Sequence, residues 1–217
     1  GGKTLFMLYS LIGQIEAGNL RGDDIFYVNE DDNFSGFLKK CEIAQKYGFS
    51  MVSSARSDDE NLRDPSSILR LITTAARGGA VDGKVFIFDT LKRFCKVMDK
   101  GQMADFSQAL RVITAGNGTV ILLGHANKNL SMDGKLVYEG VGDVQADIDI
   151  QYAIYNLSER TDERQVIRFE NEKDRGDIEM VRTMEYRKEP GLGYEGMLDS
   201  LRLADGDRVQ EIDRDLI

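Results

Sequence analysis

The sequence has few residues of the kinds that form disulfides or bind transition metals. Its 217 residues include two cysteines and one histidine. Cys41 and Cys95 stand far apart without C-x-x-C spacing, and a single histidine cannot complete a zinc cluster with them. The sequence therefore argues against a structural zinc ion, and it indicates reduced thiols in a cytoplasmic protein.

Long apolar stretches are also missing. No run approaches the roughly 18 residues that a membrane-spanning helix needs. The apolar residues that begin at Leu5 lack the basic flank and the small-residue cleavage site of a signal peptide. We therefore expect no membrane partner.

Basic residues are in the minority. The chain has 28 Lys and Arg against 37 Asp and Glu, which gives a net charge of −9 at pH 7. Because non-specific affinity for nucleic acid comes from clustered Lys and Arg, this balance argues against a protein that coats nucleic acid with its whole surface. A narrow basic channel stays compatible with it. The acidic residues that gather between Asp205 and Asp215 indicate a solvated face or a tail.

Short apolar segments that end in a polar residue alternate with segments of helical spacing. The clearest strand pattern places four apolar residues directly before Asp89. This alternation, in a chain that is 41% hydrophobic, predicts one α/β domain with a mainly parallel sheet and helices on both of its faces. The predicted strands are 24–30, 49–52, 85–90 and 119–125, and the predicted helices are 5–17, 34–47, 65–77 and 104–115.

The later sequence departs from this alternation. Residues 127–142 contain glycine and many charges of both signs, which predicts a long loop. Three further segments, 148–155, 165–169 and 178–186, look like strands joined by short polar turns, and they predict an antiparallel C-terminal extension of the sheet. Residues 188–217 give conflicting signals and receive no assignment.

The first four residues, Gly1-Gly2-Lys3-Thr4, match the second half of the phosphate-binding motif G-x-x-x-x-G-K-[ST]. In this motif backbone N–H groups face the phosphates, the lysine reaches the β and γ oxygens, and the hydroxyl binds Mg²⁺. The following helix adds the positive end of its dipole. The first half of the loop and its strand are missing, so we expect the sequence to be the later portion of a longer protein.

Polar residues at three strand ends are the candidates for chemistry. Ligands of open α/β sheets bind outside the carboxyl ends of the strands, so Glu30, Asp89 and His125 should face one nucleotide. Asp89 is placed to hold Mg²⁺ together with Thr4, although an aspartate that caps a turn is the alternative. Glu30 is the candidate for activating water, because Thr90 and not a glutamate follows Asp89.

Two of these residues also have simpler interpretations. Glu30, Asp31 and Asp32 could form nothing more than a solvated acidic turn. His125 is placed to hydrogen-bond a γ-phosphate and to pass its presence to the next loop, but a lone histidine at a strand end is more often an ordinary polar residue.

These motifs in this order resemble the RecA-like P-loop ATPases, most closely the hexameric replicative helicases of the plasmid RepA type. The resemblance implies a core over residues 1–187, ATP and Mg²⁺ as cofactors, and a homo-oligomeric ring, a hexamer in that branch, acting on single-stranded DNA. It implies that Glu30 is the catalytic base and that the strand ending in His125 lies between the phosphate-loop strand and the strand ending in Asp89. The implied nucleotide-binding residues are Gly1, Gly2, Lys3, Thr4 and Leu5.

The resemblance extends to the segment Glu172-Lys173-Asp174-Arg175-Gly176. It is similar to a turn from which the family's Lys and Arg reach the active site of the neighbouring subunit. By this match Lys173 and Arg175 are trans-acting fingers that stabilise charge on the transferring phosphoryl group. The alternative is an ordinary charged hairpin turn.

In RecA-like rings the loop after the Walker B strand, which here ends in Asp89, and the loop after the sensor strand, which here ends in His125, face the nucleic acid. These loops correspond here to 93–100 and 127–135, and their basic side chains could meet phosphates. Solvated side chains are the simpler explanation of each. The candidates are Arg93, Lys96, Lys100, Lys128 and Lys135.

Other nucleotide-binding families fit less well. A small GTPase would need glycine at Lys92 and aspartate at Leu130, and an ABC-type ATPase would need an L-S-G-G-Q-like stretch that is absent. The sequence therefore predicts a RecA-like ATPase, with a replicative DNA helicase or translocase as the first interpretation. A regulatory or recombination ATPase that does not unwind DNA is the second, and a nucleotide-binding module without turnover is the third.

Overall fold

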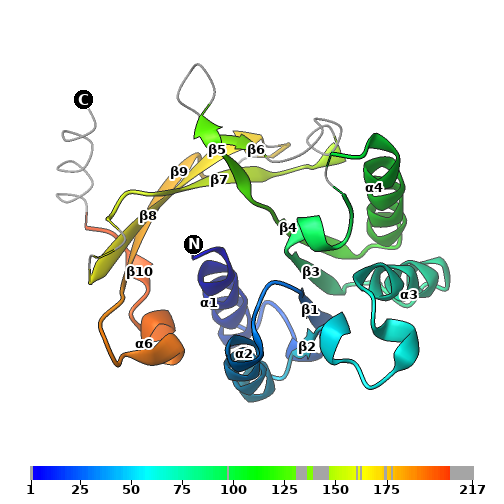
Figure 1. The fold of residues 1–217 in the computed structure, drawn as a ribbon, viewed down its shortest axis with the longest axis horizontal. Helices are drawn as coiled ribbons and strands as arrows, with labels where there is room; N and C mark the ends of the chain where they lie inside the picture. The colour runs from blue at the N-terminus through cyan, green and yellow to red at the C-terminus, as the bar shows by residue number, and fades with distance from the viewer. Residues whose placement is uncertain are drawn as a thin grey trace. The chain divides into compact units, whose positions relative to one another are not determined.

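The structure of the chain is a computed structural model (Figure 1). It divides into two compact units, Ile12–Asp147 and the combination of Gly1–Leu11 with Ile148–Ile217. We treat each unit by itself. The structure describes residues 2–96, 98–130, 136–138, 147–159, 161, 163–173, 175–176 and 178–205.

The first unit is built on a four-stranded sheet in which all strands are parallel. The strands are β1 (Ile25–Asn29), β2 (Ser50–Val52), β3 (Val85–Asp89) and β4 (Thr119–Leu123), in the order β2-β1-β3-β4. Asn29 pairs with Asp89, and Asp89 pairs with Leu123. The carboxyl ends of β1, β3 and β4 are therefore level with one another. The predicted parallel sheet is confirmed.

Helices cover both faces of this sheet, as the sequence predicts. Crossovers between parallel strands are right-handed, so the step from β1 out to β2 places α2 (Phe34–Tyr47) on one face. The steps back to β3 and on to β4 place α3 (Pro65–Arg77) and α4 (Lys100–Ala115) on the other face (Figure 1). Asn33 caps α2 by accepting the N–H of Gly36, and Gly48 ends it in the left-handed conformation.

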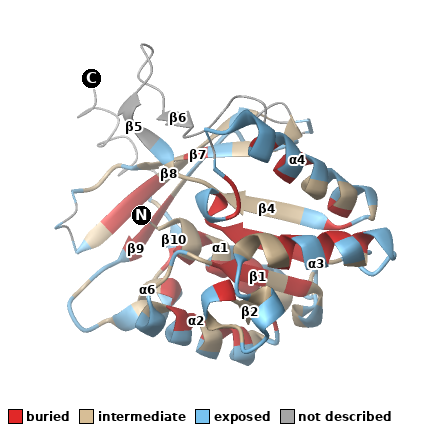
Figure 2. Cartoon of the chain, turned by 45° about the vertical axis from the view of Figure 1, so that its right-hand side comes forward, coloured by how far each residue is buried: buried red, intermediate tan, exposed pale blue. Residues whose placement is uncertain are grey.

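Aromatic side chains fill the space between β3 and α4. Phe88 is fully buried, and its ring meets Phe94 edge-on at 4.9 Å and Phe106 at 6.4 Å. Every residue of β3 is buried, which makes it the most buried strand of the sheet (Figure 2). This explains why its sequence is a nearly continuous apolar run.

Two short strands replace part of the loop predicted over 127–142. Within the described residues, β5 (Ala126–Leu130) and β6 (Leu136–Tyr138) form an antiparallel pair. The prediction of an irregular loop was wrong there. The sequence of β5 runs through Asn127, Lys128 and Asn129, so it shows no apolar alternation that would predict a strand.

The second unit contains its own antiparallel sheet. Its strands are β7 (Gln151–Asn156), β8 (Arg164–Lys173), β9 (Val181–Arg187) and β10 (Arg202–Leu203), in the order β10-β9-β8-β7. The three longer strands were predicted, but they form a separate sheet and do not extend the parallel one. Helix α6 (Gly193–Asp199) and β10 lie within the stretch that received no assignment.

Helix α1 (Lys3–Glu16) contributes its first residues to this second unit. Phe6 packs edge-on against Phe169 of β8, with ring centroids 4.8 Å apart, and against Tyr186 of β9 at 6.1 Å. Among the described residues, no helix combines the length and the apolar character needed to cross a membrane.

Both cysteines are free thiols. Burial raises the pKa of Cys95 to about 11, and its sulfur lies 3.1 Å from that of Met103. Burial also raises the pKa of Cys41. Both thiols are therefore protonated at neutral pH, which argues against a thiolate nucleophile.

Replacing Phe88 by Ala should lower the free energy of unfolding by about 3–5 kcal/mol, because the substitution empties the space between β3 and α4. Urea unfolding followed by circular dichroism measures the change. The matched control is Phe34→Ala, since Phe34 is 66% exposed, and its cost should stay within about 0.5 kcal/mol. Equal losses for the two variants would contradict the assigned core.

Candidate functional site at the carboxyl edge of the parallel sheet

The parallel register brings three predicted site residues to one edge of the sheet. Glu30 follows β1 and donates its backbone N–H to the carbonyl oxygen of Asp89 at 2.6 Å. Thr90, joined to Asp89 by a cis peptide bond, donates its hydroxyl to the carbonyl oxygen of Leu123 at 2.8 Å. His125 lies two residues beyond that carbonyl. The ends of β1, β3 and β4 are thus tied directly to one another.

Asp89 is a buried carboxylate with a hydroxyl donor. It is 2% exposed, and Tyr27 donates its phenolic O–H to Oδ2 at 2.8 Å. Tyr27 pairs with Ile87 in the sheet, so its side chain shares a face with Asp89 and reaches it diagonally. A buried carboxylate is costly without such a donor, and Tyr27 offsets part of that cost.

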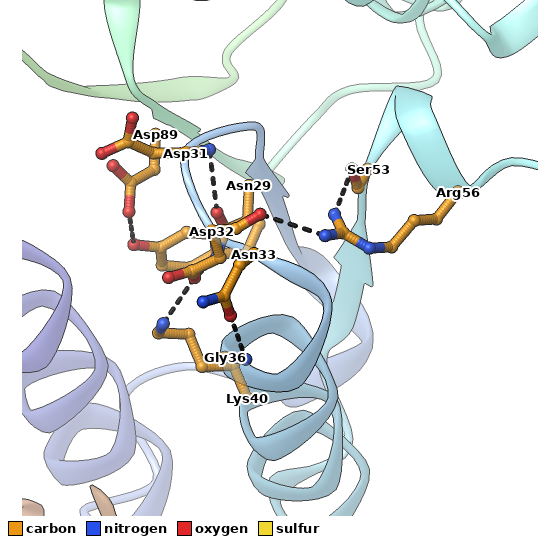
Figure 3. A network of polar contacts seen from close by, with 10 residues as sticks. Asn29, Asp31, Asp32, Asn33, Gly36, Lys40, Ser53, Arg56 and Asp89 are labelled. Atoms are coloured by element: carbon orange, nitrogen blue, oxygen red, sulfur yellow. Dashed lines mark hydrogen bonds and ion pairs between the residues drawn. The ribbon is translucent and has the colours of Figure 1, made fainter.

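The acidic turn after β1 is a hydrogen-bonded structure and not a freely solvated one (Figure 3). Asn29, fully buried, donates its amide to Asp32 at 2.5 Å and accepts the backbone N–H of Asp31 at 3.3 Å. Asp32 also forms an ion pair with Lys40, a buried lysine of α2. These contacts fix the path of the chain through residues 30–32.

Arg56 joins this turn to the segment that follows β2. Its guanidinium donates to the carbonyl oxygen of Asp32 at 3.0 Å and to the hydroxyl of Ser53 at 3.1 Å. The same group lies over the ring of Phe37, 4.6 Å from its centroid. Figure 3 shows Arg56 reaching across from the β2 side toward the turn. The cation therefore helps to balance a locally acidic edge.

The carboxylate of Glu30 is anchored to a short 3-10 helix, η2 (Ser54–Arg56). Oε1 accepts the backbone N–H of Ser54 at 2.6 Å, and Oε2 accepts the Ser54 hydroxyl at 2.9 Å. The Ser53 hydroxyl lies 3.5 Å from Oε2. The simpler interpretation of the sequence makes Glu30 a solvated surface acid, but in the structure its carboxylate is hydrogen-bonded to Ser54.

His125 faces the residue next to Glu30. Its Nε2 lies 3.8 Å from Oδ2 of Asp31, and its side chain is 32% exposed. This pair attracts electrostatically only when the imidazole is protonated. The turn after β1 thus presents one carboxylate toward η2 and the next one toward the predicted sensor.

The residues of the phosphate-binding motif lie in the second unit. Gly2 has φ +100°, a conformation that favours glycine, and its carbonyl accepts the N–H of Phe6 in the first turn of α1. Lys3 and Thr4 are partly exposed, whereas the Leu5 side chain is buried in the core. Gly1 lies outside the described residues. The roles of these residues remain predictions from the sequence.

The two predicted fingers lie at the end of β8 in the second unit. Lys173 is the last residue of β8 and pairs with Gln151 in the sheet. Arg175 is exposed and forms an ion pair with Asp149, with 2.8 Å between nitrogen and oxygen. Lys173 and Arg175 therefore lie where β8 leads toward β9, a position that is compatible with a trans-acting finger and with an ordinary charged turn.

The predicted DNA-binding residues are described only in part. Arg93, Lys96 and Lys100 are exposed, and they occupy the segment from η4 (Leu91–Arg93) to the start of α4. Lys128 belongs to β5, but its side chain is outside the described residues, as is the whole of Lys135. The three described cations follow directly after the end of β3.

The edge offers oxygen ligands for Mg²⁺ but no larger metal cluster. Among the side chains that the structure describes, no three His, Cys, Asp or Glu residues gather in a way that could hold a metal. Mg²⁺ keeps several water ligands and needs one or two protein carboxylates, so Asp89 alone fits the expected role.

Sequence reasoning missed several side chains at this edge. Lys40 could have been found from the sequence, because a lysine at the helical spacing of Phe37 and Ala44 falls on the apolar face of α2 and needs an acidic partner there. Ser53 and Ser54 could also have been found, since they follow β2 as Glu30 follows β1. Tyr27 gave no such signal, because a tyrosine within an apolar strand looks like any other core residue.

Fold and site together define an α/β protein whose parallel sheet collects carboxylate, hydroxyl and imidazole groups at its carboxyl edge. No protein-family model matches the chain, and no curated protein matches it either.

Replacing Tyr27 by Phe should lower the free energy of unfolding by about 1–3 kcal/mol, because Asp89 loses a hydroxyl donor in a buried position. Chemical unfolding at neutral pH measures the loss. Tyr9→Phe is the control, since Tyr9 is 38% exposed. A Tyr27→Phe variant as stable as the wild type would show that the hydrogen bond contributes nothing.

Proposed function

We propose that this protein hydrolyses ATP in the manner of RecA-like ring ATPases. The observation that carries the proposal is the arrangement of Glu30, Asp89 and His125, which follow or end three strands of one parallel sheet and share its carboxyl edge. That edge is where α/β sheets bind ligands. The direct pairing of β3 with β4 supports it further, because the resemblance places the histidine strand beside the Walker B strand.

Each residue has a distinct role in this proposal. Asp89 is a ligand of Mg²⁺, which neutralises charge on the phosphates. Lys3 and Thr4 keep the roles that the phosphate-binding motif gives them, in which the lysine binds phosphate oxygens and the hydroxyl binds Mg²⁺. Glu30 orients the attacking water and accepts its proton. His125 hydrogen-bonds the γ-phosphate, and its proximity to Asp31 gives it a contact with the turn that carries the base.

Lys173 and Arg175 act on the active site of a neighbouring subunit in a ring. Arg175 is exposed and Lys173 is partly exposed, which is compatible with contact with a second copy. The exposed cations Arg93, Lys96 and Lys100 are the described candidates for contact with single-stranded DNA. Contacts of these cations with phosphates would not depend on the base sequence, as a helicase or translocase in replication requires. ATP hydrolysis that single-stranded DNA stimulates would support this use. ATP hydrolysis that DNA leaves unchanged would favour the regulatory ATPase.

Replacing Glu30 by Gln should lower the turnover number for ATP by about 10²–10⁴-fold, the usual contribution of a general base, and should leave nucleotide binding intact. Phosphate release measures turnover, and a fluorescent ATP analogue measures binding. Glu42→Gln is the matched control, because Glu42 is exposed on α2. Undiminished hydrolysis by the Glu30→Gln protein would refute the assignment of the base.

Mixing two inactive variants tests action in trans. Glu30→Gln and Arg175→Ala subunits should each be inactive alone, but a mixed ring contains interfaces that join an intact Glu30 to an intact Arg175. We therefore expect ATP hydrolysis to reappear on mixing, measured as phosphate release against the ratio of the two proteins. Mixtures that stay inactive in a ring of confirmed mixed composition would exclude Arg175 as a finger in trans.

A further inference from the structure

Two buried serines follow β2 at the same edge of the parallel sheet. Ser53 and Ser54 are 4% and 2% exposed. Val28 of β1 pairs with Val52 of β2, so the serines come level with the residues that follow Val28. Buried hydroxyls are nearly always hydrogen-bonded, and these two point at one acceptor.

That acceptor is the carboxylate of Glu30, and both of its oxygens are engaged. Oε1 receives the Ser54 N–H at 2.6 Å, and Oε2 receives the Ser54 hydroxyl at 2.9 Å with the Ser53 hydroxyl at 3.5 Å. Hydrogen bonds to an ionised acceptor are stronger than those between neutral groups. Two adjacent residues therefore clamp the end of one acidic side chain.

Arg56 orients the more distant hydroxyl. Its Nη1 donates to the Ser53 oxygen at 3.1 Å, so that oxygen already serves as an acceptor and its own proton is available for Glu30. Arg56 is itself held by the carbonyl oxygen of Asp32 and by the ring of Phe37. The chain of donors runs from Arg56 through Ser53 to the carboxylate, and each bond polarises the next.

A fixed carboxylate matters for a group that must deprotonate water. A glutamate side chain loses rotamer freedom when it is immobilised, and these hydrogen bonds impose that loss before a substrate arrives. Misplacement of a catalytic group by about 1 Å can cost roughly 10²-fold in rate. A carboxylate has about four lone-pair positions, so three donors leave room for a water molecule.

We propose that Ser53 and Ser54, supported by Arg56, are positioning residues that hold Glu30 in the orientation for hydrolysis. This inference rests on the proposed function, because it assigns the serines to the same reaction. The alternative is that they only join the ends of β1 and β2. The positioning role predicts that loss of the hydroxyls lowers the rate only when Glu30 is present, whereas a purely structural role predicts the same loss without Glu30.

The test compares the double variant Ser53→Ala/Ser54→Ala with Glu30→Gln in ATP hydrolysis. The double variant keeps the backbone N–H of residue 54 and removes both hydroxyls. We expect its turnover number to fall about tenfold, with KM and the affinity for a fluorescent ATP analogue changed less than threefold. Ser54→Ala alone should also lower the turnover number, whereas Ser54→Thr, which retains a hydroxyl at position 54, should keep most of the wild-type rate. Ser57→Ala is the control, because Ser57 is a half-buried serine of the same segment whose hydroxyl accepts the backbone N–H of Asp59.

The decisive measurement repeats the double serine substitution in the Glu30→Gln protein, with single-turnover phosphate release as the readout. If the serines act through Glu30, they cause no further loss there. An equal loss in both backgrounds, or a double variant with wild-type turnover, would overturn the inference while leaving a Glu30-dependent ATPase in place. A wild-type protein that binds no ATP, or hydrolysis that ignores Glu30→Gln, would instead overturn the proposed function and this inference with it.

Discussion

The parallel hydrogen-bond ladder between β1, β3 and β4 is the constraint on which the site depends. It holds Asn29, Asp89 and Leu123 level, so that every polar group placed just after a strand emerges at one edge. A shift of one residue in any of these strands would turn its side chains to the opposite face of the sheet. The buried aromatic packing around Phe88 opposes such a shift, because it would expose large apolar rings.

Acidic groups at this edge are held by a small number of specific donors. Tyr27 supports Asp89, Lys40 supports Asp32, and the backbone and hydroxyl of Ser54 support Glu30. These donors come from a neighbouring strand, from α2 and from η2, so each carboxylate is fixed by an element that packs against its own. The edge combines negative charge with fixed side chains, and the proposed role in binding a metal and orienting water requires both.

Much of the parallel unit could be predicted from the sequence, because its strands leave short apolar runs, and Asp89 ends β3 while Glu30 and His125 follow β1 and β4. The donors to these side chains were harder to find. Tyr27 alternates with apolar neighbours as a core residue does, and its hydrogen bond depends on a cross-strand diagonal that only the register reveals. Helix α6, with seven residues, is too short to show an apolar period, and the polar residues in the middle of β5 show no apolar alternation.

The buried pair of Lys40 and Asp32 constrains how this sequence can vary. Loss of Asp32 alone would remove the ion-pair partner of an ammonium group that is buried on α2, and loss of Lys40 alone would remove one of the contacts that hold the turn. Replacement of both by apolar residues would remove the two charges together, but it would also remove the acceptor of the buried Asn29 amide. A strand end, a turn and a helix are therefore coupled energetically through one carboxylate, so that substitutions at positions 29, 32 and 40 should not be additive.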